Sequence, residues 1–520
     1  MSESNLQHKI YPYDGGNVTF KNPVFLKPEE VIYSENVVYT NYATKKKKPG
    51  LTYLFDNINT LGKNILGSYD YWRLGKQELV LWDGVDLKAI NVATGTLTTI
   101  TGHKVLPTNE AITFVPFQGI LMMFFQDSNT LPKYWTQSGV IQDFPVTTPN
   151  APFGRVWLNR LIIPDPTIRG RLLFSKTGDP TDFTTGDAFA LDLDVNDGDP
   201  DGITGISQPF FGSIYVFKRL SAYKVTPVQF QTEVVFTYSK ISDGIGCISH
   251  NAIVATEQNI FFPSDSGWHQ FESTDKISEI DTSLLSTDIQ PSWRNDVNFS
   301  QAKYMQATYD RQLNSLLLIF PTSSGLYPDE LYGFSLVTKK WFRWTDYNQT
   351  SMCRYVDNAK KKLVTVMGSS TGEIGFLDET VRKDYDKPIT VYFKSGIIAP
   401  SGQPDEEYSF KYLTPIYVPQ TSGTFTITMK IDGQTLFVET FDMTDDVAGD
   451  RLGEDFITGE SVLGDTPEFA LDKVRIGGDG MIYQLMVEHE DTSIDGVGFE
   501  LLGVIIDLEP INKGTGKRVG

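Results

Sequence analysis

The hydrophobic pattern of this chain is a series of short apolar runs separated by polar turns. Leu79–Trp82 leads through Asp83-Gly84 to Leu87–Val92, and Thr94-Gly95 then leads into Leu97–Thr101. Short runs joined by tight polar turns indicate antiparallel meanders. Many such meanders in series, without alternation of strands and helices, predict an all-β fold whose main body is an irregular β-propeller.

The spacing and length of these runs predict the domain boundaries. We expect an extended N-terminal arm over residues 1–60, a β-propeller-like body over 61–385, an additional C-terminal β-sandwich domain over 386–511 and a flexible tail over 512–520. The C-terminal strands are longer and alternate more regularly. Thr424–Ile431 alternates polar and apolar residues before Asp432-Gly433, which predicts a hairpin. The one candidate helix, Ile280–Trp293, contains Pro291, so we expect a turn or two of helix at most.

The charge of the chain bears on its partners. The formal net charge is −20, and acidic residues concentrate in Asp192–Asp201 and in Asp442–Asp472. Affinity for nucleic-acid phosphates comes from cationic side chains, so the sequence argues against a protein that grips DNA or RNA. Two interpretations stay open: the acidity keeps the protein soluble, or it forms a non-adhesive wall that faces a polyanion.

The cysteines and the apolar runs exclude several classes of protein. Cys247 and Cys353 are the only cysteines, so neither a disulfide framework nor a structural zinc site is expected. Met1–Gly16 has no apolar stretch of the kind found in a secretory leader, and no run is long enough for a membrane span. We therefore expect folding in a reducing cytosol.

Two motifs are candidates for a catalytic site and a metal site. Gly368–Gly372 matches G-x-S-x-G, but a second strand follows it where a nucleophile elbow needs a helix, so we interpret it as a hairpin turn. The acidic run fails the EF-hand pattern at Asp197 and Ile203. Either a looser site for a hard cation or a solvated acidic turn fits the run, and the metal-ligand candidates are Asp192, Asp194, Asp197, Asp199 and Asp201. No catalytic residue, cofactor or cofactor-binding residue is assigned.

The order of several short motifs resembles one protein family, the tail nozzle (tail tubular protein B-like, head–tail hub) proteins of short-tailed bacteriophages. The resemblance rests on Gly15-Gly16-Asn17, Pro23, Glu29-Glu30, Asn36, Lys48–Leu51, Ile241–Cys247, Asn259–Phe262, Ser266-Gly267, Tyr309-Asp310, Leu316–Phe320, Leu331–Leu336, Trp341, Phe499–Val504 and Glu509-Pro510. The resemblance covers most of the chain, and it lies in the composition of these short motifs and in their order along the sequence. The departures are the acidic insertion Asp442–Asp472 and the four-lysine run Lys45–Lys48.

The resemblance implies a non-enzymatic structural protein of the virion tail. Such proteins form a six-fold ring below the portal and adaptor, with a propeller body and β-rich tip domains around a DNA channel used in genome retention and ejection. The implied partners are five further copies of the chain, the head–tail adaptor ring, the tail fibres and double-stranded DNA that passes without specific binding. The protein would be made in the host cytoplasm.

Two groups of residues are candidates for roles in such a ring. The channel or gate loop candidates are Asp445, Asp446, Asp450, Glu454 and Asp455, and the ring or adaptor contact candidates are Lys45, Lys46, Lys47 and Lys48, interpreted as a basic run in a turn. A glycan-binding or glycan-hydrolysing propeller is the alternative, since the aromatic residues near Trp341–Trp344 and Tyr69–Trp72 either stack on sugars or fill the core. A cellular scaffold propeller is a third hypothesis.

Overall fold

The computed structural model describes most of the chain, and the described residues form two compact units. Described are residues 6–40, 44–55, 58, 60–102, 106–127, 129–137, 140–194, 202–230, 233–273, 280–358, 361–402, 404–444, 469–490 and 496–511. Unit 1 takes in residues 1–52, 334–344 and 378–520, and unit 2 takes in 53–333 and 345–377. The predicted tail at 512–520 lies outside the described residues.

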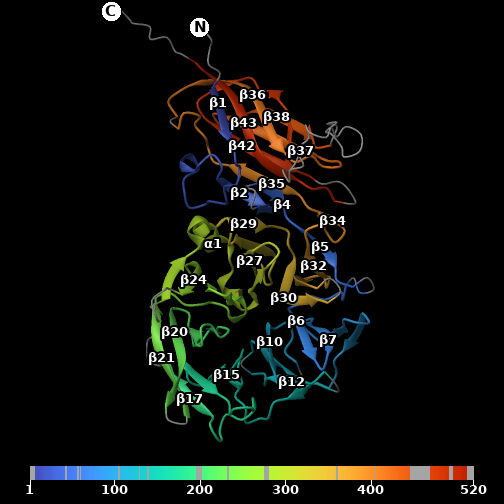
Figure 1. Cartoon of the computed structure of the whole chain (residues 1–520), viewed down its shortest axis with the longest axis vertical. Helices are drawn as coiled ribbons and strands as arrows, with labels where there is room; N and C mark the ends of the chain where they lie inside the picture. Colours follow the sequence, from blue (N-terminus) through green and yellow to red (C-terminus); the bar gives the residue numbers. More distant parts are fainter. Residues whose placement is uncertain are drawn as a thin grey trace, which may run out of the picture. The chain divides into compact units, whose positions relative to one another are not determined.

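Six of the sheets formed by the described residues are built from four consecutive strands each, and a seventh begins with three consecutive strands, which is the organisation of a β-propeller. Figure 1 shows the sheets of unit 2 following one another around a ring. The first three sheets are β6 (Gly67–Arg73), β7 (Lys76–Trp82), β8 (Leu87–Asn91), β9 (Thr96–Thr99); β10 (Ile112–Phe117), β11 (Ile120–Phe125), β12 (Lys133–Trp135), β13 (Gln142–Asp143); and β14 (Arg155–Trp157), β15 (Arg160–Pro164), β16 (Arg171–Phe174), β17 (Phe189–Asp192). The propeller prediction is confirmed.

The next four sheets continue in chain order. They are β18 (Gly205–Ile206), β19 (Ile214–Phe217), β20 (Ser221–Phe230), β21 (Glu233–Asp243); β22 (Val254–Ala255), β23 (Asn259–Ser264), β24 (Gly267–Ser273), β25 (Ile280–Leu284); β26 (Gln306–Asp310), β27 (Ser315–Phe320), β28 (Glu330–Ser335), β29 (Trp341–Trp344); and β30 (Gln349–Asp357), β31 (Lys362–Ser369), β32 (Ile374–Asp378), β5 (Gly50–Tyr53), β33 (Lys383–Asp384), β34 (Lys387–Pro388). The last sheet is the exception to chain order, because β5 comes from the N-terminal part of the sequence.

The middle strands of the propeller sheets are buried on both faces. Every residue of β27 is buried, as is every residue of β7 after Lys76. A strand packed between two neighbouring sheets has no solvent side, so its sequence is a continuous apolar run rather than an alternation. Trp82 of one sheet meets Phe125 of the next edge to face, with ring centroids 5.2 Å apart. Such contacts between neighbouring sheets form the core of the propeller.

Backbone hydrogen bonds close the ring within unit 2. The N–H groups of Leu54, Leu61 and Ile65 donate to carbonyls of the last sheet and its turn, at 3.0, 2.8 and 3.1 Å respectively. The segment that precedes the first sheet therefore covers the open edge of the last one. The same turn contains Gly368–Gly372, which joins β31 to β32 as a hairpin with Ser370 exposed. The prediction of a turn rather than a nucleophile elbow is confirmed.

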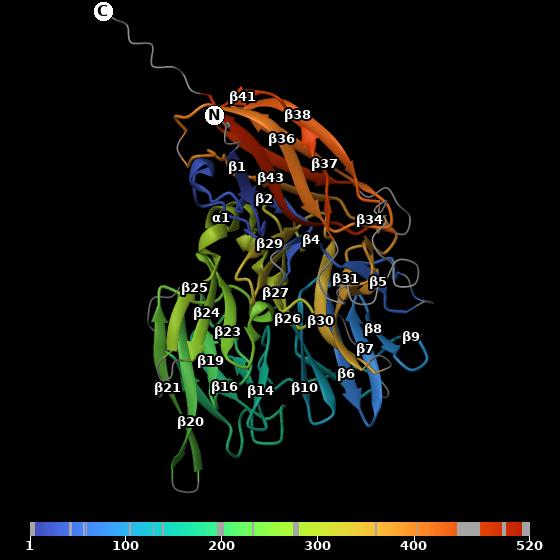
Figure 2. The same ribbon diagram turned by 45° about the horizontal axis from the view of Figure 1, so that its top comes forward.

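Unit 1 contains two sheets that share one hydrophobic cluster. One sheet has the order β3-β4-β43-β36-β39, with β1 beside β43 and with β40 and β41 beside β36, and the other has the order β2-β35-β42-β37-β38. The strands are β1 (Leu6–Ile10), β2 (Val31–Glu35), β3 (Val37–Tyr39), β4 (Lys45–Lys47), β35 (Val391–Ser395), β36 (Tyr408–Tyr417), β37 (Thr424–Ile431), β38 (Gln434–Asp442), β39 (Ala470–Leu471), β40 (Val474–Arg475), β41 (Asp479–Gly480), β42 (Tyr483–His489) and β43 (Glu500–Pro510). Figure 2 shows β36 and β43 lying side by side.

The strands of unit 1 alternate, as expected for a sheet with one buried face. In β37 every second residue is buried, starting with Phe425. The predicted hairpin is confirmed, because Ile431 pairs with Gln434 across Asp432 and Gly433, whose φ angles are 47° and 82°. Two successive positive φ angles are the geometry of a type I′ turn, which favours this dipeptide.

The N-terminal segment differs from the predicted separate arm. Strand β1 pairs with β43, so that Leu6 lies opposite Leu508 and Ile10 opposite Val504. Strand β2 pairs with β35. Residues from both ends of the sequence thus belong to one unit, and the predicted division between residues 1–60 and 386–511 does not describe it. Pairing between segments so distant in sequence leaves no local signal.

Helical structure is short, as the sequence predicts. The α-helix α1 (Gln290–Asp296) follows the 3₁₀ segment η3 (Ser286–Ile289) and buries Trp293. The other 3₁₀ segments are η1 (Pro23–Phe25), η2 (His250–Ala252) and η4 (Phe299–Tyr304). Among the described residues, none of the helices has the length and hydropathy needed to cross a bilayer.

Candidate functional site

The ring of sheets in unit 2 surrounds a cavity of about 430 Å³. Its lining comes mainly from the first strands of the sheets, in particular β6, β10, β14, β22, β26 and β30. The polar and charged residues of the lining are Ser68, Tyr69, Asp70, Thr113, Arg155, Gln208, His250, Asn251, Gln306, Thr308, Cys353 and Arg354. This volume falls in the range of about 300–1,000 Å³ that is typical of small-molecule sites.

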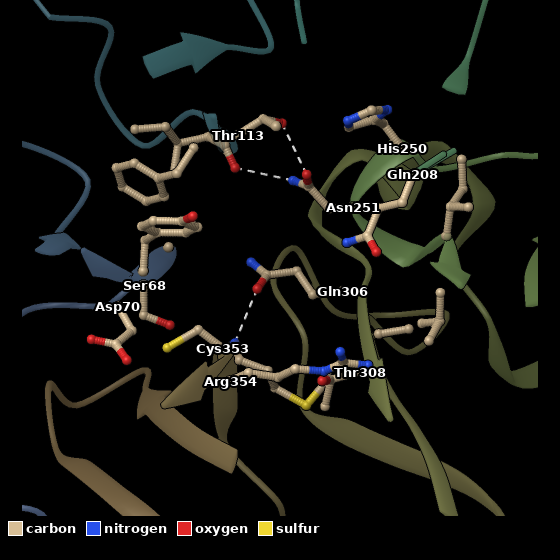
Figure 3. Close-up of a pocket in the computed structure, with 18 of the residues that line it drawn as sticks. Ser68, Asp70, Thr113, Gln208, His250, Asn251, Gln306, Thr308, Cys353 and Arg354 are labelled. Atoms are coloured by element: carbon tan, nitrogen blue, oxygen red, sulfur yellow. Dashed lines mark hydrogen bonds between the residues drawn. The ribbon is translucent and has the colours of Figure 1, made fainter. Parts of the chain in front are cut away.

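Several of these polar groups are occupied in holding neighbouring sheets together. Figure 3 shows Thr113 joined to Asn251, with the Thr113 hydroxyl donating to the Asn251 amide oxygen at 2.9 Å. The Asn251 amide nitrogen donates to the carbonyl of Ile112 at 3.0 Å. Gln306 donates to the carbonyl of Leu66 at 3.1 Å and accepts from the backbone N–H of Met352 at 3.0 Å. These side chains bridge sheets that are not linked by strand pairing.

Asp70 is the carboxylate in the described lining, and its oxygens already accept several hydrogen bonds. It accepts from the Gln77 amide at 2.9 Å, from the Trp72 indole at 3.2 Å and from the backbone N–H of Val356 at 3.0 Å. A carboxylate held by three donors on different strands is fixed in place. Through these hydrogen bonds Asp70 holds β6 and β30 together where they line the cavity.

Arg155 and His250 form a second group of polar side chains in the lining. The guanidinium of Arg155 donates to the carbonyl of Ile206 through Nη2 at 3.2 Å, and Nη2 also lies 3.3 Å from Nε2 of His250. The imidazole of His250 stacks on Phe153, with ring centroids 4.3 Å apart and an interplanar angle of 9°. The Nδ1 atom of His250 accepts from the backbone N–H of Ile206 at 3.1 Å. Backbone and ring contacts thus fix both side chains.

Four groups of the lining, those of His250, Arg155, Tyr69 and Cys353, keep one protonation state around neutral pH. Burial, aided by the positive charge of Arg155, holds the pKa of His250 well below its usual 6.5. Burial lowers the pKa of Arg155 to about 10, so its guanidinium stays charged. Burial raises the pKa of Tyr69 and that of Cys353 to about 12. At neutral pH these four residues therefore present a cation, a neutral imidazole, a phenol and a thiol.

The expected acidic wall is not found in this cavity. Its described lining holds the carboxylate of Asp70 and the guanidinium groups of Arg155 and Arg354. The negative charge of the sequence must therefore lie elsewhere on the chain. This cavity therefore does not supply a negatively charged channel wall that faces DNA.

The acidic run proposed as a metal site is only partly described. Asp192 accepts from Arg171 Nη2 at 3.0 Å, within a two-pronged ion pair across β16 and β17. The carboxylate of Asp194 accepts from the Tyr238 hydroxyl at 3.0 Å. Asp197, Asp199 and Asp201 lie outside the described residues. Within the part of the chain that the structure describes, no cluster of His, Cys, Asp or Glu could hold a metal ion.

The four-lysine run is a strand, so its interpretation as an exposed turn is wrong. Residues Lys45–Lys47 form β4, and the side chains of Lys45, Lys47 and Lys48 are buried. Lys47 donates to the carbonyl of Val497 at 2.8 Å, and Lys48 forms an ion pair with Asp384 at 2.5 Å. Only Lys46 of this run keeps a partly exposed side chain, with its amine 3.9 Å from Glu500. Burial of the other three removes them as candidates for a ring or adaptor contact.

The remaining predicted residues divide between the core and the undescribed segments. Trp341 and Trp344 are buried, which confirms the core interpretation for them, whereas Tyr69 and Trp72 line the cavity. The gate candidates Asp445, Asp446, Asp450, Glu454 and Asp455 lie outside the described residues.

Sequence reasoning missed the residues of the central cavity. Ser68, Thr113 and Arg155 each stand in the first strand of a four-stranded meander. Once the strands are grouped into sheets, such residues are expected to converge on the axis of the propeller. The irregular spacing of the meanders hid this grouping.

Comparisons with known proteins find only distant structural similarity. No protein-family model matches the chain, and no curated protein matches it. A chain in the crystal structure of BBS1N in complex with ARL6DN is 14% identical, with a TM-score of 0.39, over 64% of this chain and 98% of that one. The Cps50 (Swd1) β-propeller domain from Myceliophteria thermophila is 10% identical, with a TM-score of 0.39, over 63% and 98%. A chain of the Mitotic Checkpoint Complex is 8% identical, with a TM-score of 0.36, over 61% and 93%. The strand order of the seven sheets carries the propeller assignment.

Proposed function

We propose that this chain is a structural subunit of the tail nozzle of a short-tailed bacteriophage. The observation that carries the proposal is the pairing of a β-propeller with a second all-β unit built from segments before and after it. The family that the sequence resembles is implied to have this combination of a propeller body and β-rich tip domains. The subunit would assemble with copies of itself into a six-fold ring, bounded by the adaptor and the tail fibres.

The charge and the cavity bear on where DNA would pass in such a ring. The net charge of −20 disfavours adhesion of a polyanion, which suits a conduit. The central cavity has the volume of a small-molecule site and is bridged by Asn251 and Gln306, so a duplex cannot pass through it. In this proposal the channel is formed between copies of the chain and not inside one propeller.

Two experiments test the proposal: detection of the chain in purified phage particles, and electron microscopy of the purified chain. Particles from a culture that carries the gene should contain the chain, and an antibody against it should label the tail. The purified full-length chain, imaged alone and after mixing with the adaptor, should form a six-fold ring. A chain that stays monomeric with and without the adaptor and is missing from purified particles would overturn the proposal.

The alternative of a glycan-binding propeller has one observation in its favour. Trp72 is 42% exposed and lines the cavity together with Tyr69 and Phe114, close to the polar side chains described above. Aromatic faces beside polar groups can bind sugars. Hydrolysis has less support, because it needs a pair of carboxyl groups and the described lining offers Asp70. A glycan array that shows no binding to the full chain, with no release of reducing sugar, would dismiss this alternative.

A further inference from the structure

The central cavity contains buried hydrogen-bond donors that lack an acceptor. His250 is 2% exposed, and its Nε2 atom lies 3.3 Å from Nη2 of Arg155. A guanidinium can only donate hydrogen bonds. The nature of this contact therefore depends on which imidazole nitrogen carries the proton.

The backbone decides the tautomer of His250. The N–H of Ile206 points at Nδ1 from 3.1 Å, and a backbone N–H can only donate, so Nδ1 has to be the acceptor. The ring proton consequently sits on Nε2. The Nε2–H of His250 and the Nη2–H of Arg155 then face each other as two donors, with no acceptor between them among the described residues.

The charge of Arg155 points in the same direction. Its guanidinium lines the cavity and donates to the neutral carbonyl of Ile206 at 3.2 and 3.4 Å. No carboxylate of the described residues forms an ion pair with it. A partly buried cation without a counter-charge is costly, and a bound anion would remove that cost. The phenol of Tyr69 lines the same cavity.

We propose that the central cavity of the propeller binds a small oxyanion, a carboxylate or phosphate group, between the guanidinium of Arg155 and the Nε2–H of His250. The planar guanidinium matches the spacing of carboxylate and phosphate oxygens, and the imidazole N–H supplies a further donor to the same group. Phe153 holds the imidazole plane, and Ile206 holds both side chains through its backbone. The site is independent of the proposed role in a tail.

Calorimetric titration of the full chain tests the site. The probes are inorganic phosphate and acetate, with sodium chloride at equal ionic strength as the reference. We expect saturable binding with one site per chain for at least one oxyanion, and the stronger of the two probes identifies the phosphate or the carboxylate class. If neither probe shows saturable binding, the proposal is overturned, because the donors are then satisfied by water and not by an oxyanion.

Three variants locate the binding. Arg155→Met should weaken oxyanion binding by at least about tenfold, since a charge-assisted hydrogen bond is lost. His250→Gln should retain binding within a few fold, because its amide can accept from Ile206 and still donate into the cavity. Arg354→Met is the matched control, since Arg354 lines the same cavity but is exposed and does not contact His250. Equal losses in the Arg155 and Arg354 variants would indicate general attraction to a cation and would overturn the proposal.

A structural measurement covers the case in which the Arg155 variant does not fold. Crystals of the unaltered chain grown in phosphate should show electron density for an oxyanion between Arg155 and His250, and crystals grown in chloride should lack it. Density for water alone at that position in both conditions would contradict the site.

Discussion

The ammonium group of Lys45 lies 3.7 Å from the centre of the Tyr13 ring, inside the core of unit 1. It donates to the carbonyl of Tyr13 at 2.8 Å and to that of Glu29 at 3.1 Å. The rings of Tyr39 and Phe393 lie at 5.7 and 5.6 Å. A lysine amine enclosed by rings and carbonyls is unusual, because burial disfavours its charged form.

This burial predicts a dependence of stability on pH. Burial holds the pKa of Lys45 well below its usual 10.5, so the unfolded chain binds more protons here than the folded chain. The free energy of unfolding should rise as the pH increases above the lowered pKa, by up to about 1.4 kcal/mol per pH unit. The rise should level off near the pKa that Lys45 has in the unfolded chain. Urea unfolding between about pH 8 and 9.5, below the range where tyrosines ionise, measures this slope. Lys45→Met should reduce the slope to the part contributed by Lys48, whose pKa burial also lowers, whereas Lys46→Met, at a partly exposed site, should keep the full slope. Equal slopes in both variants would refute this account.

Gln306 is predicted to stabilise the propeller as a bridge between sheets. Replacing it with Leu leaves the carbonyl of Leu66 and the N–H of Met352 without their partner, so the free energy of unfolding should fall by roughly 1–3 kcal/mol. Denaturant unfolding measures the change. Gln208→Leu is the control, because Gln208 lines the same cavity and is exposed; a loss as large as that of the Gln306 variant would contradict the bridge.

Two glycines of the Ile241–Cys247 motif should respond differently to Ala. A Cβ at Gly246 would lie 2.0 Å from the backbone oxygen of Lys218, so Gly246→Ala should prevent folding or destabilise the propeller severely. Gly244 has a φ of 84° and open space around it, so Gly244→Ala should cost only the strain of a left-handed conformation, roughly 1–2 kcal/mol. Thermal unfolding of the two variants checks the order, and the reverse order would show that this close approach does not constrain the fold.

Both cysteines are predicted to be unreactive in the folded chain. Burial raises the pKa of Cys247 and that of Cys353 to about 12, so at pH 8 almost no thiolate is present. A thiol-reactive disulfide reagent should modify neither residue within minutes in buffer and both in denaturant. Rapid modification of Cys353 in the native chain would show that the cavity admits the reagent and leaves the thiol ionisable.

The sequence predicted the elements whose signals are local. Leu79–Trp82 is an apolar run that predicts a strand, and Asp432-Gly433 predicts a tight hairpin because few dipeptides tolerate two positive φ angles. It failed where partners are distant in sequence. Lys45 looked solvated, since nothing nearby in the sequence shows that Tyr13 and Phe393 surround it. His250 gave no signal because its contacts with Phe153 and Arg155 arise only when the sheets close into a ring.

The pairing of β1 with β43 has a consequence for the timing of folding. Leu6–Ile10 leaves the ribosome long before its partner strand Glu500–Pro510 is made. The propeller sheets from β6 to β25 have all their strands long before then. During synthesis the early strands of unit 1 must therefore wait without their partners, and a chain halted before residue 500 would have all the strands of its propeller sheets but an incomplete second unit.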